Sequence, residues 1–282
     1  MKLFRKLFHR AKRRVKTTIP AGNFVKLPDD NDGRIFLRIN GTGNSIKIGT
    51  LRTGCNRLNI NITGNNNSIE IGDNFFTSTE FNVLVGQLSD NYGPANDVKI
   101  KIGNWVQIEG AWLSTFNSGA VVEIGDECMF SNEVVLMQTD SHPIFDQNGK
   151  IINFINTMKI GNHVWLGTRV AVLKNSHLAD GVVVGGGSVV AGKFDEPNCV
   201  IAGNPARVVR HNIKWTDYSR EYCRNNHDAV PNILSFFDTI EGIRNGMSIA
   251  RFNDGEVGAM FFGRDFLFQK TTSELVKRLK EV

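Results

Sequence analysis

The stretch from Ile160 to Asp195 divides into six consecutive groups of six residues, here called hexads, that share one pattern. An aliphatic residue opens every hexad, Gly or Ala follows it in five of them, and Val, Ser or Phe occupies the fifth place. A six-residue period fits neither an α-helix nor an ordinary pair of strands. It is typical of a parallel β-solenoid, in which each short face takes one hexad and stacked coils share a core. The pattern predicts that the opening aliphatic residue points inward, that the small residue permits a tight corner and that the fifth residue packs beside the stack.

The same logic extends toward the N-terminus in a looser register. The segments Ile39–Gly49 and Ile62–Gly72 match with an offset of 23 residues, and each reads as an alternating strand, a Gly/Asn corner and a second alternating strand. These segments are expected to be the first coils. Ile39, Ile46 and Ile48 are expected to face inward.

Regular hexads begin at Ile102, resume at Ile124 and break at residues 141–157, which fit no hexad, before the repeat restarts at Met158. Residues 87–96 are expected to form another loop between coils. A loop that projects from a rigid scaffold often carries function. The break at 141–157 is therefore the first place to look for chemistry.

The hexads resemble those of the hexapeptide-repeat acyltransferases. The resemblance implies an all-β solenoid, a left-handed parallel β-helix over residues 22–210, and Ile201–Arg210 resembles the segment that closes the solenoid in this family. It also implies a homotrimer with active sites at subunit interfaces, and flat solenoid faces could be buried by such association. Binding modules and a zinc carbonic anhydrase class share the scaffold, so the fold by itself does not decide the chemistry.

A His-Pro pair at the start of the loop, in Thr139-Asp-Ser-His-Pro143, is the candidate catalytic motif. Transfer of an acyl group to a sugar hydroxyl needs a general base, and an imidazole with a pKa near 6.5 suits that role. The motif resembles the catalytic His-Pro of sugar O-acetyltransferases, which places the base on His142. Asp140 could orient the imidazole or merely cap the turn. The accessory asparagine of galactoside-type relatives has no clear match, and Glu109 is the candidate in that region.

The resemblance also implies that acetyl-CoA lies along the solenoid edge between two subunits. Its pantetheine arm is expected against the side chain of Trp165 and the backbone of two turns of small residues, which allow close approach and expose N–H donors for an oxyanion. The turn residues are Gly167, Thr168, Gly185 and Gly186. Lys193 and Arg207 are the cations expected to meet the CoA phosphates. The alternatives are plain packing for the tryptophan and a solvated face for the two cations.

Cysteine and histidine spacing argues against a metal site. The four cysteines (Cys55, Cys128, Cys199 and Cys223) show no paired spacing, which favours a reducing compartment, with Cys128 as an ordinary buried thiol. His163 and His177 fall at outward hexad positions, so no set of three convergent imidazoles for zinc is evident. Without a signal peptide or an apolar run of membrane-spanning length, the chain is expected in the cytoplasm.

The first 21 residues form a basic arm. Residues 1–16 carry eight Lys and Arg and no acid, so the net charge of +5 for the whole chain leaves −3 for the remainder. Their apolar residues fall on one helical face, which is typical of a helix drawn to an anionic membrane surface at the inner face of the membrane. A solvated tail is the alternative. Nucleic-acid binding is not expected, because nothing downstream supplies base-stacking or groove-reading elements.

The C-terminal part changes character. Residues 211–246 are expected to be a helical linker, and residues 247–282 resemble the beginning of a GT-D type glycosyltransferase domain, with Asp254 and Glu256 as its acidic pair. The resemblance covers too few residues for a complete domain and implies a truncated segment, which is expected to be structural or inert within this chain.

These observations predict an acetyl-CoA-dependent O-acetyltransferase that acts on a sugar hydroxyl of a cell-surface polysaccharide, such as capsule. The acceptor would be a polysaccharide or an oligosaccharide. Two alternatives remain at this stage: N-acetylation of an amino sugar nucleotide, and a non-catalytic scaffold for a bifunctional glycosyltransferase. A glycosyltransferase activity of the chain itself would need the missing remainder of that domain.

Overall fold

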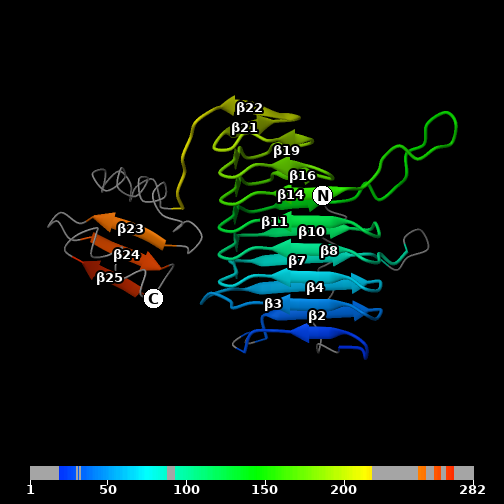
Figure 1. Cartoon of the computed structure of the whole chain (residues 1–282), viewed down its shortest axis with the longest axis horizontal. Coiled ribbons are helices and arrows are strands. Elements are labelled where there is room, and N and C mark those ends of the chain that lie inside the picture. Colours follow the sequence, from blue (N-terminus) through cyan, green and yellow to red (C-terminus); the bar gives the residue numbers. More distant parts are fainter. Residues whose placement is uncertain are drawn as a thin grey trace.

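The computed structural model describes residues 19–29, 31, 33–87 and 93–217, together with the backbone of three strands near the C-terminus. From residue 19 to Arg210 the described structure is a solenoid of short strands, nearly all parallel, arranged in three sheets (Figure 1). No helix occurs among the described residues. Each sheet is named here by its first strand: the β1 face, the β2 face and the β6 face.

Strands β1 to β4 alternate between two faces, and from β5 to β21 the strands visit the three faces in turn. Within each face every strand pairs with the equivalent strand of the neighbouring coils. The β1 face contains β1 (Phe24–Lys26), β3 (Ser45–Ile48), β5 (Ser68–Ile71), β8 (Lys99–Ile102), β11 (Val121–Ile124), β14 (Thr157–Ile160), β17 (His177–Leu178) and β20 (Lys193–Phe194). The β2 face contains β2 (Ile35–Asn40), β4 (Arg57–Thr63), β7 (Glu80–Val85), β10 (Ala111–Thr115), β13 (Val134–Met137), β16 (Ala171–Leu173) and β19 (Val189–Val190). The β6 face contains β6 (Phe76–Thr77), β9 (Gln107–Ile108), β12 (Met129–Phe130), β15 (Trp165–Leu166), β18 (Val183–Val184), β21 (Val200–Gly203) and β22 (Ala206–Arg210). All these pairings are parallel except that of β21 with β22, an antiparallel hairpin at the end of the solenoid.

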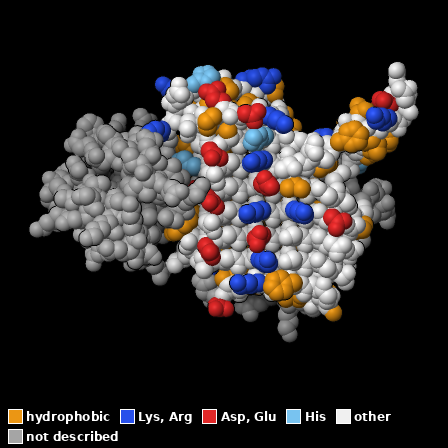
Figure 2. Space-filling view, viewed as in Figure 1, with side chains coloured by type: hydrophobic (Ala, Val, Ile, Leu, Met, Phe, Trp, Pro, Cys, Tyr) orange, Lys and Arg blue, Asp and Glu red, His pale blue; other side chains and the backbone are white. Residues whose placement is uncertain are grey.

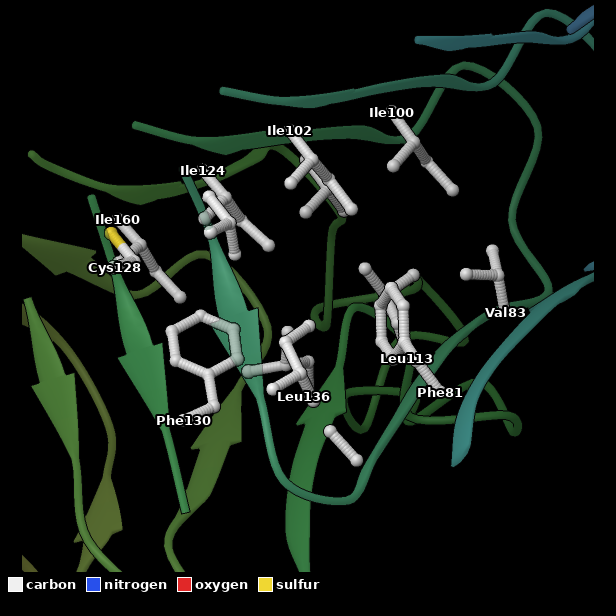
Figure 3. Packing of buried hydrophobic residues seen from close by; sticks show 14 of the residues in the cluster. Phe81, Val83, Ile100, Ile102, Leu113, Ile124, Cys128, Phe130, Leu136 and Ile160 are labelled. Atoms are coloured by element: carbon white, nitrogen blue, oxygen red, sulfur yellow. The ribbon is translucent and has the colours of Figure 1, made fainter. Parts of the chain in front are cut away.

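The core is a set of stacked columns inside the prism. All six opening residues of the hexads from Ile160 to Asp195 are buried, as are Ile39, Ile46 and Ile48 of the first coils, so the predicted inward positions are confirmed. Figure 3 shows Ile102, Ile124 and Ile160 following one another along such a column, with Phe130 beside them. Cys128 lies in the same core, and burial raises the pKa of its thiol to about 12, as expected for an inert structural cysteine.

The corner that joins the β1 face to the β6 face carries a ladder of acidic and amide side chains. Each side chain accepts, through Oδ1, the backbone N–H of its counterpart in the preceding coil, at 2.7–2.9 Å. Along the solenoid the ladder reads Asp73, Asn104, Asp126, Asn162 and Asp180. Carboxylates and amides alternate, so no two of these carboxylates stand in adjacent coils.

The outer surfaces of the β1 and β2 faces differ in chemistry. One outward row of the β1 face is charged from coil to coil, and Figure 2 shows it as a column of blue and red side chains. In register the row is Lys26, Lys47, Glu70, Lys101, Glu123, Lys159, His177 and Lys193. The upper part of the β2 face instead presents an apolar patch, which consists of Trp112, Val135, Met137, Ala171, Leu173 and Val189.

Four segments discussed above fall wholly or partly outside the described residues: most of the basic arm (1–18), the middle of the loop expected at 87–96 (88–92), the greater part of the expected linker (218–246) and the segment with Asp254 and Glu256 (252–256). The described start of the linker, residues 211–217, is irregular. Strands β23 (Met247–Arg251), β24 (Val257–Phe261) and β25 (Asp265–Gln269) form an antiparallel sheet. The glycosyltransferase-like character of this segment stays a prediction.

Candidate active site

The break in the repeat forms a projecting loop between β13 and β14, at the corner that joins the β2 face to the β1 face (Figure 1). Its two arms pair: Phe145 bridges Ile151, and the N–H of Ile152 donates to the carbonyl of Ile144 at 2.9 Å. Figure 2 shows apolar side chains on this projection. The exposed large apolar residues of the loop are Ile144, Phe145, Ile151, Ile152 and Phe154.

His142 stands at the start of this loop, as predicted, on a backbone held by a tight turn. Ser141 has a positive φ of 65°, the N–H of Ser141 donates to Thr139 Oγ1 at 2.9 Å, and the N–H of His142 donates to the carbonyl of Asp140 at 2.7 Å. The hydroxyl of Thr139 donates in turn to Asn117 Oδ1 at 2.7 Å, in the coil below. These hydrogen bonds hold the backbone at His142 in place, and the side chain of His142 is exposed at the surface.

Asp140 is held by two neighbours. Lys174 Nζ lies 2.8 Å from Asp140 Oδ2, and Asn153 Nδ2 donates to the same oxygen at 2.7 Å. Partial burial raises the pKa of the Asp140 carboxyl, but the hydrogen bonds from Lys174 and Asn153 and the lysine charge together outweigh that effect and lower it. Asp140 is therefore ionised at neutral pH, and both contacts use Oδ2.

The structure places three further polar residues at this corner that sequence reasoning missed: Asn117, Asn153 and Lys174. The hexad register contained a signal for one of them. Met137 pairs with Leu173, so the next residue, Lys174, stands one coil above the loop exit. No comparable signal existed for Asn153, because it lies inside the irregular loop. Glu109 lies elsewhere, at the corner between the β6 and β2 faces, where its carboxylate accepts from Asn132 Nδ2 at 2.7 Å.

The residues expected to contact the pantetheine arm gather at that other corner. Gly167 and Thr168 follow β15, Gly185 and Gly186 follow β18, and the coils stack closely, with the N–H of Gly167 donating to the carbonyl of Val184 at 2.9 Å. A Cβ at Gly167 would lie 2.8 Å from both Gly186 N and Val184 O. Glycine at this turn is therefore required by coil stacking, whether or not a ligand also approaches it.

Trp165 lies on the outer side of the β6 face and is partly covered by the segment that follows the solenoid. Its ring lies 5.9 Å from that of Trp215, and its Nε1 donates to Ser131 Oγ at 3.3 Å. Trp215 also stacks on His163 at 4.0 Å and donates from Nε1 to the His163 carbonyl at 3.0 Å. Burial lowers the pKa of His163, while its contact with the Trp215 carbonyl acts in the opposite direction.

The two predicted phosphate-binding cations lie apart. Lys193 is exposed on the β1 face, in register with His177, whereas Arg207 lies on β22 at the end of the β6 face. Within one chain, His142, Asp140 and Lys193 thus lie on one side of the β2 face. Trp165, the two glycine turns and Arg207 lie on the other side. The apolar patch of the β2 face lies between these two groups.

No group of three or more His, Cys, Asp or Glu side chains among the described residues could hold a metal ion. No helix in the described part of the chain has the length and hydropathy of a membrane span.

Comparison with known proteins identifies the family, although no family profile matches the chain. The chain is 34% identical over 188 residues to a polysialic acid O-acetyltransferase of Neisseria meningitidis, an alignment that covers 62% of this chain and 86% of the relative. It is also 34% identical over 119 residues to a polysialic acid O-acetyltransferase of Escherichia coli O1:K1 / APEC, of which the match spans only 38%. The crystal structure of the polysialic-acid-specific acetyltransferase NeuO superposes with a TM-score of 0.53 at 28% identity, and the match covers 68% of this chain and 90% of that one.

These similarities confirm the predicted left-handed parallel β-helix and the predicted enzyme class, an acetyltransferase with acetyl-CoA as acyl donor. They extend over most of the solenoid rather than over a single motif. The chain belongs to the hexapeptide-repeat O-acetyltransferases.

Proposed function

We propose that this chain transfers the acetyl group of acetyl-CoA to a hydroxyl group of an acidic capsular polysaccharide of the polysialic acid type. The observation that carries the proposal is the alignment with the meningococcal polysialic acid O-acetyltransferase over 86% of its length. The structural similarity to NeuO supports the same substrate class. Because both relatives are named for acetylation of a polymer, N-acetylation of a sugar nucleotide and a purely scaffolding role are less favoured.

His142 is proposed as the general base. Its neutral imidazole takes the proton of the acceptor hydroxyl while the hydroxyl oxygen attacks the thioester carbonyl carbon. The tetrahedral intermediate then collapses, the carbon–sulfur bond breaks, and the imidazolium returns the proton to the leaving thiolate. The acetyl group passes directly from sulfur to oxygen, without an acetylated enzyme.

Asp140 is proposed to support this base. Lys174 and Asn153 both bind Oδ2, and the lowered pKa keeps the carboxyl ionised. The second oxygen, Oδ1, can therefore accept an N–H from the imidazole when the side chain of His142 turns toward it. Such a contact would fix the tautomer and stabilise the imidazolium that forms during the reaction.

A homotrimer is proposed because the two groups of predicted site residues lie on opposite sides of the β2 face. A second copy packed against the apolar patch would bring its pantetheine-binding corner toward the His142 loop of the first copy. The patch offers uncharged surface for such packing, in contrast to the charged row of the β1 face. The five exposed apolar residues of the loop would also be buried against the partner.

The activity is tested by thiol release from acetyl-CoA with oligomers of polysialic acid, with neutral oligosaccharides and without acceptor. Acceptor-dependent release in the wild type that disappears in His142→Ala supports both the activity and the base. His211→Ala is the matched control, because His211 is an exposed histidine paired with Glu196 at the end of the solenoid. Release that persists in His142→Ala would refute the assigned base, and release with neutral acceptors alone would refute the substrate class.

The shared site is tested by complementation between two inactive variants. His142→Ala loses the base and Gly186→Trp obstructs the opposite corner, so each alone is expected to be inactive. Co-expressed subunits should regain part of the activity, because some interfaces then combine an intact loop with an intact glycine corner. Absence of any recovery in mixed oligomers of demonstrated composition would place the whole site within one chain.

A further inference from the structure

We infer that Asn153 is a positioning residue for His142, an inference that rests on the proposed role of His142 as general base. The side chain of Asn153 makes three hydrogen bonds around that residue. Its Nδ2 donates to Asp140 Oδ2 at 2.7 Å and to the carbonyl of His142 at 2.9 Å, and its Oδ1 accepts the N–H of Ile144 at 2.7 Å. One amide therefore binds the chain before, at and after the proposed base.

The local sequence explains why a side chain has to bind the backbone around His142. Residue 143 is a proline, which has no N–H, so the first backbone donor after His142 is that of Ile144. Between β13 and β14 the projecting loop also leaves the ladder of backbone hydrogen bonds that joins each coil to its neighbours. Asn153 replaces that ladder by satisfying the His142 carbonyl and the Ile144 N–H with one side chain.

Asn153 is itself fixed through its neighbour in sequence. The carbonyl of Phe154 accepts Asn175 Nδ2 at 2.9 Å and Lys174 Nζ at 3.4 Å, both from the coil above the loop. The same Lys174 binds Asp140. The rigid coil therefore anchors the returning arm of the loop, and the returning arm holds the outgoing arm that carries His142.

Because the three bonds act on backbone and carboxylate rather than on a substrate, loss of Asn153 should alter turnover and leave substrate affinity intact. A displacement of about 1 Å in a catalytic group can lower a rate by about 100-fold. Asn153→Ala is expected to lower kcat by about 10- to 100-fold with the KM values for acetyl-CoA and acceptor little changed. Asn153→Asp should lose more, because it keeps an acceptor for Ile144 but sets a second carboxylate against Asp140 Oδ2.

The experiment compares both variants with Asn148→Ala, another asparagine of the same loop that is exposed and bonds Asp146 only through its backbone N–H. Steady-state kcat and KM are measured together with thermal midpoints.

The expected result is a fall in kcat for both Asn153 variants, with unchanged KM values, an unchanged thermal midpoint and wild-type behaviour of Asn148→Ala. Equal kcat values for Asn153→Ala and Asn148→Ala would overturn the inference. So would a loss confined to KM, or a loss of kcat that only follows a fall in thermal midpoint. Failure of the proposed function is distinguishable, because it would appear as inactive wild type or as full activity in His142→Ala.

Discussion

The alternating ladder at the corner between the β1 and β6 faces can be tested by breaking its order. Asn104→Asp would place carboxylates in three adjacent coils, at positions 73, 104 and 126, while keeping the Oδ1 acceptor that receives the N–H of Asp73. Adjacent coils are about 4.8 Å apart, so each new like-charge pair costs about 0.9 kcal/mol at the dielectric constant of water. The weak bond from Asn104 Nδ2 to Asp126 Oδ1, at 3.3 Å, is lost as well.

The free energy of unfolding should therefore fall by about 2 kcal/mol, a drop in thermal midpoint of about 4–8 °C. The deficit should shrink in high salt, which screens the new repulsion. It should also shrink on acidification. The repulsion raises the folded-state pKa of the introduced carboxyl, so the penalty is complete above that pKa and vanishes as the pH falls toward about 4, the usual pKa of a carboxyl in the unfolded chain.

The measurements are thermal and urea unfolding at low and high salt and at several pH values. Asp126→Asn is the matched control, because it keeps the acceptor, removes a carboxylate and should change stability by less than about 0.5 kcal/mol. Wild-type stability of Asn104→Asp at low salt and neutral pH would refute the electrostatic reasoning. A deficit that is independent of salt and pH would assign the effect to the lost amide bond.

Three further changes test other parts of the structure. Phe130→Ala empties a fully buried core position and should cost about 3–5 kcal/mol in urea unfolding. Trp215→Ala uncovers His163, so the pKa of that imidazole should rise toward its ordinary value in an NMR titration. Because burial lowers the pKa of His163 in the folded wild type, its stability should fall as the pH drops below about 6.5, and the variant should show less of this loss. Gly167→Ala sets a Cβ 2.8 Å from Gly186 N and should lower the thermal midpoint.

Each of these three predictions has a result that would contradict it. Val121→Ala, on the outer side of β11, is the control for the core change, and equal losses in the two would deny the packing argument. An unchanged titration of His163 would mean that Trp215 does not exclude water from it. Full stability of Gly167→Ala would show that neighbouring coils can separate at this corner without cost.

The core of the solenoid could be predicted from the sequence because the residues that define each face lie close together in the chain. A hexad that opens with Ile160 or Leu166 carries the inward position, the corner and the packing residue within six residues, and the next hexad repeats them. The position of His142 was predictable for a related reason, since the loop is visible as a failure of the repeat.

The surroundings of His142 were not predictable in the same way. Asn117 and Lys174 reach this corner from other coils, and their proximity depends on how many residues each coil contains. Asn153 lies in a loop whose two arms meet only in three dimensions. The packing of Trp215 on His163 depends on the path that the chain takes after the last coil, which no periodic pattern encodes.

The hairpin of β21 and β22 has a consequence for how copies of this protein can meet. The open edge of a parallel sheet is a template on which the first coil of another molecule could continue the stack, and such head-to-tail addition has no natural end. On the β6 face the last parallel strand is already paired with β22, which runs the opposite way. The reversal of one short strand therefore guards this sheet against growth into a fibre, because an antiparallel edge does not match the parallel strands of a further coil.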